Sequence, residues 1–162
     1  MFAATLAFPA AITVVAALSG GSLPGIHTDD TKLHAPVAVA SGWGPVFRVD
    51  AVEVNNDPSS YLLEHDGTFG SAIHRWNGDP ATLSAVAHDP RSMPFRVRQA
   101  PPKNELIIGS AGGTEILTSI YYKSPQIQAV ELNPVTVGLL RHKLADYSGH
   151  VATYPGVHMH QG

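Results

Sequence analysis

A glycine-rich loop and one acidic residue carry the chemistry that this sequence suggests. The loop, residues 109–113, reads Gly-Ser-Ala-Gly-Gly, and such small residues let backbone N–H groups approach a ligand closely. Glu131 follows Gly109 by 22 residues, close to the spacing at which a carboxylate binds ribose hydroxyls while the loop faces the rest of a nucleotide. A carboxylate suits two vicinal hydroxyls because it accepts two hydrogen bonds. Together these features predict a nucleotide site.

The predicted elements around the loop place it beside Glu131. Residues 106–108 (Leu-Ile-Ile) predict a short strand buried on both faces, and residues 127–132 predict a second strand that carries Glu131 at its end. Residues 114–123 predict a helix because Ile116, Leu117 and Ile120 fall on one face. The crossover of this βαβ unit should be right-handed. The loop and Glu131 then share the carboxyl edge of a parallel sheet, where ligands bind.

Other readings of the same motif remain open. The glycines could serve only a strand-to-helix turn, and Glu131 could be a solvated strand end. The loop departs from Gly-x-Gly-x-x-Gly because Ala111 occupies the second glycine position, and no Gly-Lys-Ser/Thr follows it. These departures argue against a dinucleotide and against a nucleoside triphosphate.

Two motifs resemble the first two motifs of class I S-adenosylmethionine-dependent transferases: residues 107–113 (Ile-Ile-Gly-Ser-Ala-Gly-Gly) and residues 130–134 (Val-Glu-Leu-Asn-Pro). More narrowly, the chain resembles the spermidine-synthase-like branch, because residues 43–50 and 61–67 resemble its small N-terminal β domain and residues 154–162 its third strand. The resemblance covers residues 43–162. It implies an α/β fold in which a small N-terminal β region precedes an incomplete Rossmann-like parallel sheet with flanking helices.

The resemblance also implies an activity and a set of ligands. The chain would bind S-adenosylmethionine or its decarboxylated form as substrate, and would transfer an aminopropyl group to a polyamine. Its partners would be this nucleotide and an amine, with a homo-oligomer left open because such synthases are commonly oligomeric. The nucleotide-binding residues that it implies are Gly109, Ser110, Ala111, Gly112, Gly113, Glu131, Leu132 and Asn133.

Two departures from the family keep other functions open. Gly112 stands where spermidine synthases usually carry an acid, which favours an S-adenosylmethionine-dependent methyltransferase or an inactive relative. The family's catalytic aspartate and polyamine-binding acids lie beyond the third strand, so the resemblance assigns no catalytic residue within residues 1–162. We therefore interpret the chain as truncated, and a catalytically incomplete, membrane-associated fragment is a further alternative.

The N-terminal residues are apolar. Residues 1–18 contain no charge, and their length is at the lower limit for a membrane span. The alternatives are the remnant of a larger membrane region, a secretory signal, although a positive n-region is absent, and a buried apolar segment. The chain is therefore predicted to be membrane-associated, with a cytoplasmic nucleotide domain, or cytoplasmic.

The hydrophobic pattern and the clusters of turn-forming residues divide the chain into four parts. Residues 1–25 are the apolar segment, residues 26–42 a linker with little stable structure, residues 43–98 the β-rich domain and residues 103–162 the partial nucleotide-binding domain. Within the third part we predict strands at 46–54, 60–64 and 69–74, turns at 55–59 and 65–68, and a helix at 81–87. In the fourth, Asn133 and Pro134 predict the start of a helix over residues 133–147.

Composition excludes several classes of function. The net charge is −3 and no basic run appears, so nothing indicates a nucleic-acid partner. There is no cysteine, which excludes disulfides and thiolate metal sites. Of the nine histidines, His158 and His160 would share a face on a strand, but no third ligand is apparent, and we predict no metal.

Overall fold

The computed structural model describes Val14 and residues 38–54, 57–98 and 100–162. The elements given below lie within the compact unit Lys32–Gly162. The predicted membrane segment, residues 1–18, falls outside the described residues apart from Val14. In the part of the chain that is described, no helix has the length and apolar character needed to cross a membrane.

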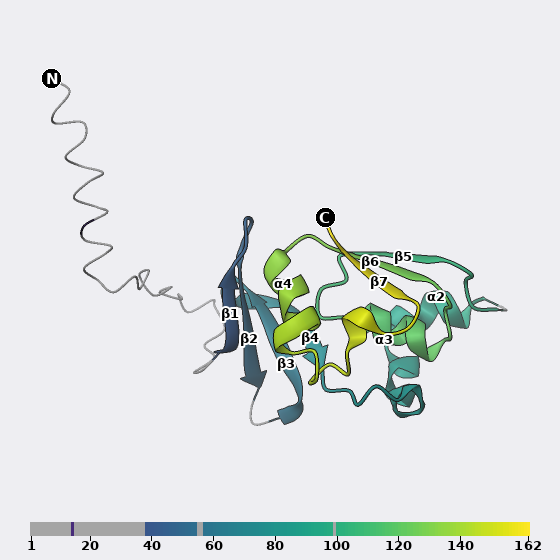
Figure 1. Cartoon of the computed structure of the whole chain (residues 1–162). Coiled ribbons are helices and arrows are strands. Elements are labelled where there is room, and N and C mark those ends of the chain that lie inside the picture. The colour runs from purple at the N-terminus through teal and green to yellow at the C-terminus, as the bar shows by residue number, and fades with distance from the viewer. Residues whose placement is uncertain (1–13, 15–37, 55–56, 99) are drawn as a thin grey trace, which may run out of the picture. The chain divides into compact units, whose positions relative to one another are not determined.

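A four-stranded antiparallel sheet comes first along the chain (Figure 1). Its strands follow each other in sequence order: β1 (Ala38–Trp43), β2 (Arg48–Val54), β3 (Asp57–His65) and β4 (Thr68–His74). The turn between β3 and β4 uses Asp66 and Gly67, both with positive φ (50° and 76°), as expected for a tight two-residue hairpin. The small N-terminal β region predicted from the sequence is therefore confirmed.

Two predictions in this region were wrong. Part of the predicted linker, residues 38–42, belongs to β1, which pairs with β2 and buries Ala40 to 2% exposure. The sequence did not predict this strand, because its alanine, serine and glycine side chains are small and give little alternation of apolar and polar residues. Residues 57–59, predicted as a turn, open β3 instead, because a register shift near Val54 lets Asp57 pair with it.

Short helices connect the two sheets. The predicted helix at 81–87 is a 3-10 helix, η1 (Pro80–His88), and two further short helices follow it, η2 (Pro90–Ser92) and α2 (Met93–Arg96). Asp79 and Asp89 each accept a backbone N–H from the first turn of the helix that follows. The Asp-Pro pairs therefore start helices here, because the aspartate caps and proline suits the first turn.

The second sheet is parallel and has the order β5-β6-β7. Its elements are β5 (Glu105–Ile108), α3 (Thr114–Tyr121), β6 (Ile127–Glu131), α4 (Pro134–Gly138), the π-helix η3 (Leu139–Lys143), η4 (Val151–Thr153) and β7 (Val157–Gln161). The predicted βαβ unit and the third strand are confirmed. The fold class is therefore α/β: an antiparallel sheet followed by a three-stranded parallel sheet with helices.

The helix after β6 is shorter than predicted. Asn133 does cap it, but α4 passes into a π-helix at Leu139 and the helical turns end at Lys143 rather than Tyr147. The backbone N–H of Leu144 bonds to the carbonyl of Leu139, five residues back. This wider turn ends the regular helix while both leucines stay buried.

The parallel sheet buries one face more than the other. Helices α3 and α4 both contact β6, and on that side Ile107, Ala129 and Met159 are buried. On the other side Leu106 is 63% and Ile108 80% exposed, so the prediction of a strand buried on both faces was wrong. Among the described residues the helices cover one face of this sheet only. The apolar residues 106–108 therefore do not indicate a strand that is buried on both faces.

Candidate functional site

The glycine loop lies between β5 and α3 and is held against β6. The N–H groups of Gly109 and Ser110 both donate to the carbonyl of Val130, at 2.9 and 3.0 Å. Gly109 and Gly113 have φ of +77° and +89°, and Ala111 has +41°. A Cβ added at Gly109 would meet no atom within 4 Å, so the surface of the loop is open there. The predicted sharp strand-to-helix turn is confirmed.

Glu131, at the end of β6, is bound to this loop. One carboxylate oxygen, Oε2, accepts the N–H of Ala111 at 2.8 Å, and the other, Oε1, accepts the N–H of Asn133 at 2.8 Å. The residue is only 6% exposed. Each ionised oxygen has acceptor capacity for more than one hydrogen bond, so both can still accept a ligand hydroxyl. The carboxylate therefore joins the glycine loop to the turn that begins α4.

Asn133 ties the same turn to the antiparallel sheet. Its Oδ1 accepts the N–H of Val135 at 3.0 Å, as predicted for a helix cap, and its Nδ2 donates to the carbonyl of Phe47 at 3.1 Å. The side chain is 1% exposed. Its neighbour Leu132 is 55% exposed and presents an apolar surface beside Glu131. Of these two predicted binding residues, Asn133 therefore has a buried side chain and Leu132 an exposed one.

Strand β4 packs against the glycine loop, a contact that sequence reasoning missed. The N–H of Gly112 donates to Oγ of Ser71 at 3.4 Å, and a Cβ added at Gly112 would overlap the carbonyl oxygen of Ala72. No side chain fits at Gly112 unless one backbone moves. The three small residues of β4, Gly70-Ser71-Ala72, are the one sequence feature that indicates such a close approach.

The turn of the β3–β4 hairpin brings an unpredicted histidine toward Glu131. The ring of His65 stacks on Phe47, with 4.3 Å between centroids. Burial lowers the pKa of His65, and the negative charges of Glu131 and Asp66 oppose this effect. Sequence reasoning treated His65 as part of a turn, because nothing in the sequence indicates that it lies near Glu131.

The predicted site residues come together as a group. The loop residues 109–113, Glu131 and Asn133 meet at the carboxyl edge of β5 and β6. Ser110 is fully buried, and its hydroxyl has no hydrogen-bond partner in the described part of the chain. Among all the described residues, no three histidine, aspartate or glutamate side chains are arranged to bind a metal ion.

Solved spermidine synthases share this arrangement of elements. A spermidine synthase in complex with the transition-state analogue AdoDATO aligns over 80% of this chain, with a TM-score of 0.55 and 18% identity. The spermidine synthase from Thermotoga maritima aligns over 77%, with a TM-score of 0.53 and 18% identity. A probable spermidine synthase from Corynebacterium glutamicum ATCC 13032 aligns over 79%, with a TM-score of 0.54 and 17% identity.

The class that these likenesses define is a spermidine-synthase-like α/β fold. No protein-family model and no curated protein sequence matches the chain. The aligned part spans 41%, 41% and 45% of the three solved chains, which is less than half of each. At such low identity the likeness shows the fold, and the activity is a separate question.

Proposed function

We propose that the chain binds the adenosyl part of S-adenosylmethionine, or of its decarboxylated form, at the glycine loop and Glu131. The observation that carries this proposal is the position of Glu131. It stands at the carboxyl end of β6, and its two oxygens accept the N–H of Ala111 in the loop and the N–H of Asn133 at the start of α4, at 2.8 Å each. The complex of one matched synthase with AdoDATO supports the same class of ligand.

The roles follow from the geometry around Glu131. Its remaining acceptor positions receive the ribose hydroxyls. The open surface at Gly109 lets the rest of the ligand approach the backbone, since nothing lies within 4 Å of a Cβ placed there. Leu132, which is 55% exposed, offers apolar contact to the adenine ring.

The proposed reaction is attack by an amine on the carbon beside the sulfonium. The positive sulfur makes this carbon electrophilic and leaves as a neutral thioether, so a protein acts mainly by proximity and orientation. In spermidine-synthase-like chemistry the group transferred is aminopropyl and the acceptor a polyamine. The chain spans less than half of the matched synthases. We therefore assign no described residue to the binding of the polyamine.

Methyl transfer is the second candidate, and Gly112 supports it. An acidic side chain there would overlap the carbonyl of Ala72, so this loop provides no carboxylate at that position for the amino group of a decarboxylated ligand. Intact S-adenosylmethionine differs by its carboxylate, which an acid in the loop would repel. The packing of β4 on the loop, which leaves no room for an acid at Gly112, therefore favours intact S-adenosylmethionine over its decarboxylated form.

Calorimetric titration of the full chain with each of the two nucleotides tests the proposal. Preference for the decarboxylated form would support aminopropyl transfer, and preference for the intact form would support methyl transfer. If a folded sample bound neither, the nucleotide site would be wrong.

A pair of glycine substitutions gives the matched control. Gly109→Ala places a methyl group on the open loop surface, and we expect nucleotide affinity to fall roughly tenfold because the ligand no longer reaches the backbone. Gly78→Ala introduces similar strain, since Gly78 has φ +84° and its nearest neighbour would be 3.8 Å from the new Cβ, but it lies outside the loop. Equal loss of affinity in both variants would contradict the assignment.

A further inference from the structure

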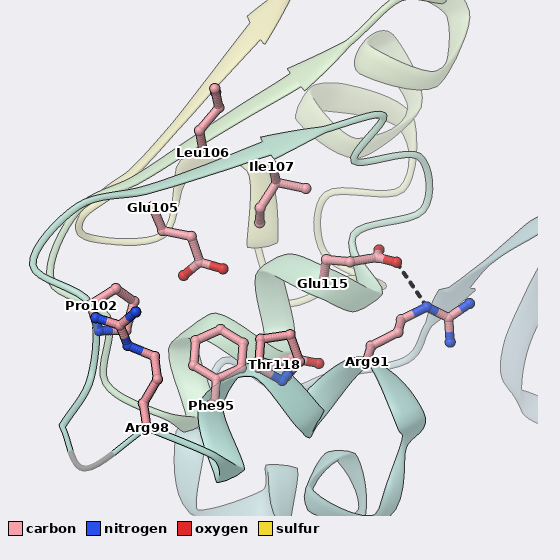
Figure 2. Close-up of a pocket in the computed structure, with 10 residues that line it drawn as sticks. Arg91, Phe95, Arg98, Pro102, Glu105, Leu106, Ile107, Glu115 and Thr118 are labelled. Carbon is pink, nitrogen blue, oxygen red and sulfur yellow. Dashed lines mark hydrogen bonds and ion pairs between the residues drawn. The ribbon is translucent and has the colours of Figure 1, made fainter.

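A cavity of about 360 Å³ lies beside β5, and Glu105 at the start of this strand is one of its lining residues (Figure 2). Strand β5, α2 and α3 contribute most of its walls. The lining residues are Arg91, Pro94, Phe95, Arg98, Pro102, Glu105, Leu106, Ile107, Glu115 and Thr118. None of the nucleotide-site residues lines this cavity.

Glu105, the first residue of β5, has half of its carboxylate satisfied. Oε1 accepts the hydroxyl of Ser119 at 2.8 Å. Oε2 is buried and has no hydrogen-bond partner. Figure 2 shows the carboxylate pointing into the space between β5 and the helices. A buried carboxylate oxygen without a donor is costly, so this position calls for a donor that the described residues do not supply.

The positive charge of Arg91 is already used elsewhere. Its Nε donates to Glu115 at 2.8 Å (Figure 2). Its Nη1 lies 3.0 Å from Oδ2 of Asp89. Arg98, the other cation of the cavity, is exposed, and its Nε faces the carbonyl of Ala100 at 3.4 Å. In the described part of the chain neither arginine donates a hydrogen bond to Oε2 of Glu105.

The remaining wall of the cavity is apolar. Phe95, Ile107 and Pro102 surround the space that the carboxylate faces. The ring of Phe95 stacks on Tyr122 at 4.9 Å, which fixes its orientation. A bare anion would be repelled by Glu105, and a hydrated metal ion would find one free carboxylate among hydrocarbon side chains. An organic cation with a hydrocarbon body matches both kinds of wall.

We propose that this cavity binds a primary ammonium group on a short aliphatic stem. The ammonium donates to Oε2 of Glu105 as a charge-assisted hydrogen bond. The stem lies along Phe95 and Ile107, and the ion pair of Arg91 with Glu115 closes the far end. The ligand class is therefore a small alkylamine, and this site is separate from the nucleotide site and does not depend on it.

Titration of the full chain with n-butylamine, followed by ¹H–¹⁵N correlation spectra, tests the proposal. We expect saturable shifts, with a dissociation constant on the order of 1 mM for so small a ligand, confined to amides near the cavity such as those of Glu105 and Ser119. The amides of Ala111 and Glu131 report the nucleotide site and should not move. Shifts that appear only there would overturn the assignment to this cavity.

Two substitutions and a neutral ligand separate the carboxylate from general effects. Glu105→Gln should weaken butylamine binding tenfold or more, because an amide replaces the anion. Glu53→Gln removes the same charge from an exposed position on β2 and should leave the affinity unchanged. 1-Butanol should bind much more weakly than butylamine. Equal binding by folded Glu105→Gln, equal binding of butanol, or no saturable binding by the unmodified chain would each overturn the proposal.

Discussion

Two glutamates stand at opposite ends of the parallel sheet and differ in how they are satisfied. Glu131, at the carboxyl end of β6, has a backbone N–H on each oxygen and is 6% exposed. Glu105, at the start of β5, has one serine hydroxyl on one oxygen and nothing on the other. The first carboxylate is part of the framework of its site, whereas the second lines a cavity and lacks a donor.

The antiparallel sheet packs on the carboxyl end of the parallel sheet, where Glu131 lies. β4 packs its backbone on Gly112, and the carbonyl of Phe47 receives Asn133, so the carboxyl end of the parallel sheet is closed over by a second sheet. On the face of the parallel sheet that the helices do not cover, Leu106 and Ile108 of the outer strand β5 are exposed. The parallel sheet therefore has a carboxyl end in backbone contact with the second sheet, and an outer strand, β5, with an exposed face and no described strand on its outer side.

The contact between the two sheets gives the largest expected effect. Gly112→Ala should destabilise the fold by about 3 kcal/mol, because its Cβ overlaps the carbonyl of Ala72 and overpacking against backbone is not relieved by a rotamer change. Gly109→Ala, in the same loop but with open space around it, should cost only about 1 kcal/mol from its positive φ. Urea unfolding of both variants measures the difference. Equal costs would mean that β4 does not press on the loop.

The next effect compares the two carboxylates directly. Glu131→Ala should cost about 2 kcal/mol or more, because it leaves the N–H groups of Ala111 and Asn133 without their partner in a buried place. Glu105→Ala should change stability by less than about 1 kcal/mol, because it loses one hydroxyl bond and removes an unsatisfied oxygen. Thermal or urea unfolding checks this order. A larger loss at Glu105 would mean that Glu105, and not Glu131, is the carboxylate that holds the fold together.

A smaller effect is expected in the pH dependence at the closed end. Burial lowers the pKa of His65, so below its ordinary value of about 6.5 the unfolded chain binds more protons than the folded chain at this residue. Stability is therefore fully present above that pH and is lost as the pH falls from about 6.5 through the lowered pKa of the folded state. His65→Gln should reduce this slope, by less than about 1 kcal/mol between pH 7.5 and 5.5, as measured by urea unfolding at both pH values.

His74 should contribute to the same loss of stability at low pH. Burial is the largest cause that lowers its pKa as well, with Arg91 adding to the effect and Asp89 and Glu115 opposing it. His74→Gln should therefore also flatten the acid side of the stability profile. If neither variant changes the slope, the histidines are not desolvated as the structure indicates.

The central βαβ unit could be predicted from sequence because its determinants are local. The glycines fix the turn after β5, the apolar face of α3 has helical spacing, and Asn133 caps α4. Glu131 could be predicted from its position at the end of the second strand and from its spacing after Gly109. Its bonds to Ala111 and Asn133 also join neighbours of the same unit, which is why residues chosen by spacing came together.

What could not be predicted depends on contacts between distant segments. β1 has small side chains and is a strand only because β2 pairs with it. The packing of Ala72 on Gly112 and the approach of His65 to Glu131 join residues from two different sheets. The exposure of Ile108 depends on which face of the sheet the helices cover, and an apolar run does not encode that choice.

The smallest expected change in stability comes from the open edge, where the effect is on association instead. Ile108 is 80% exposed on β5, and no described strand pairs with the outer side of β5. Ile108→Lys should leave the free energy of unfolding within about 0.5 kcal/mol, because little apolar surface is buried there. It should, however, reduce concentration-dependent association, because a charge on an exposed edge strand opposes pairing with another chain.

Sedimentation velocity over a range of protein concentrations measures this effect. Val46→Lys is the matched control, since Val46 is 62% exposed but lies between β1 and β2, away from the edge of β5. Both variants add one positive charge to the chain, so a general effect of charge on solubility would appear in both. A change confined to Ile108→Lys would locate association at β5. Equal changes would mean that the open edge is no more adhesive than the rest of the surface, and that the contrast between the two ends of the sheet concerns the carboxylates alone.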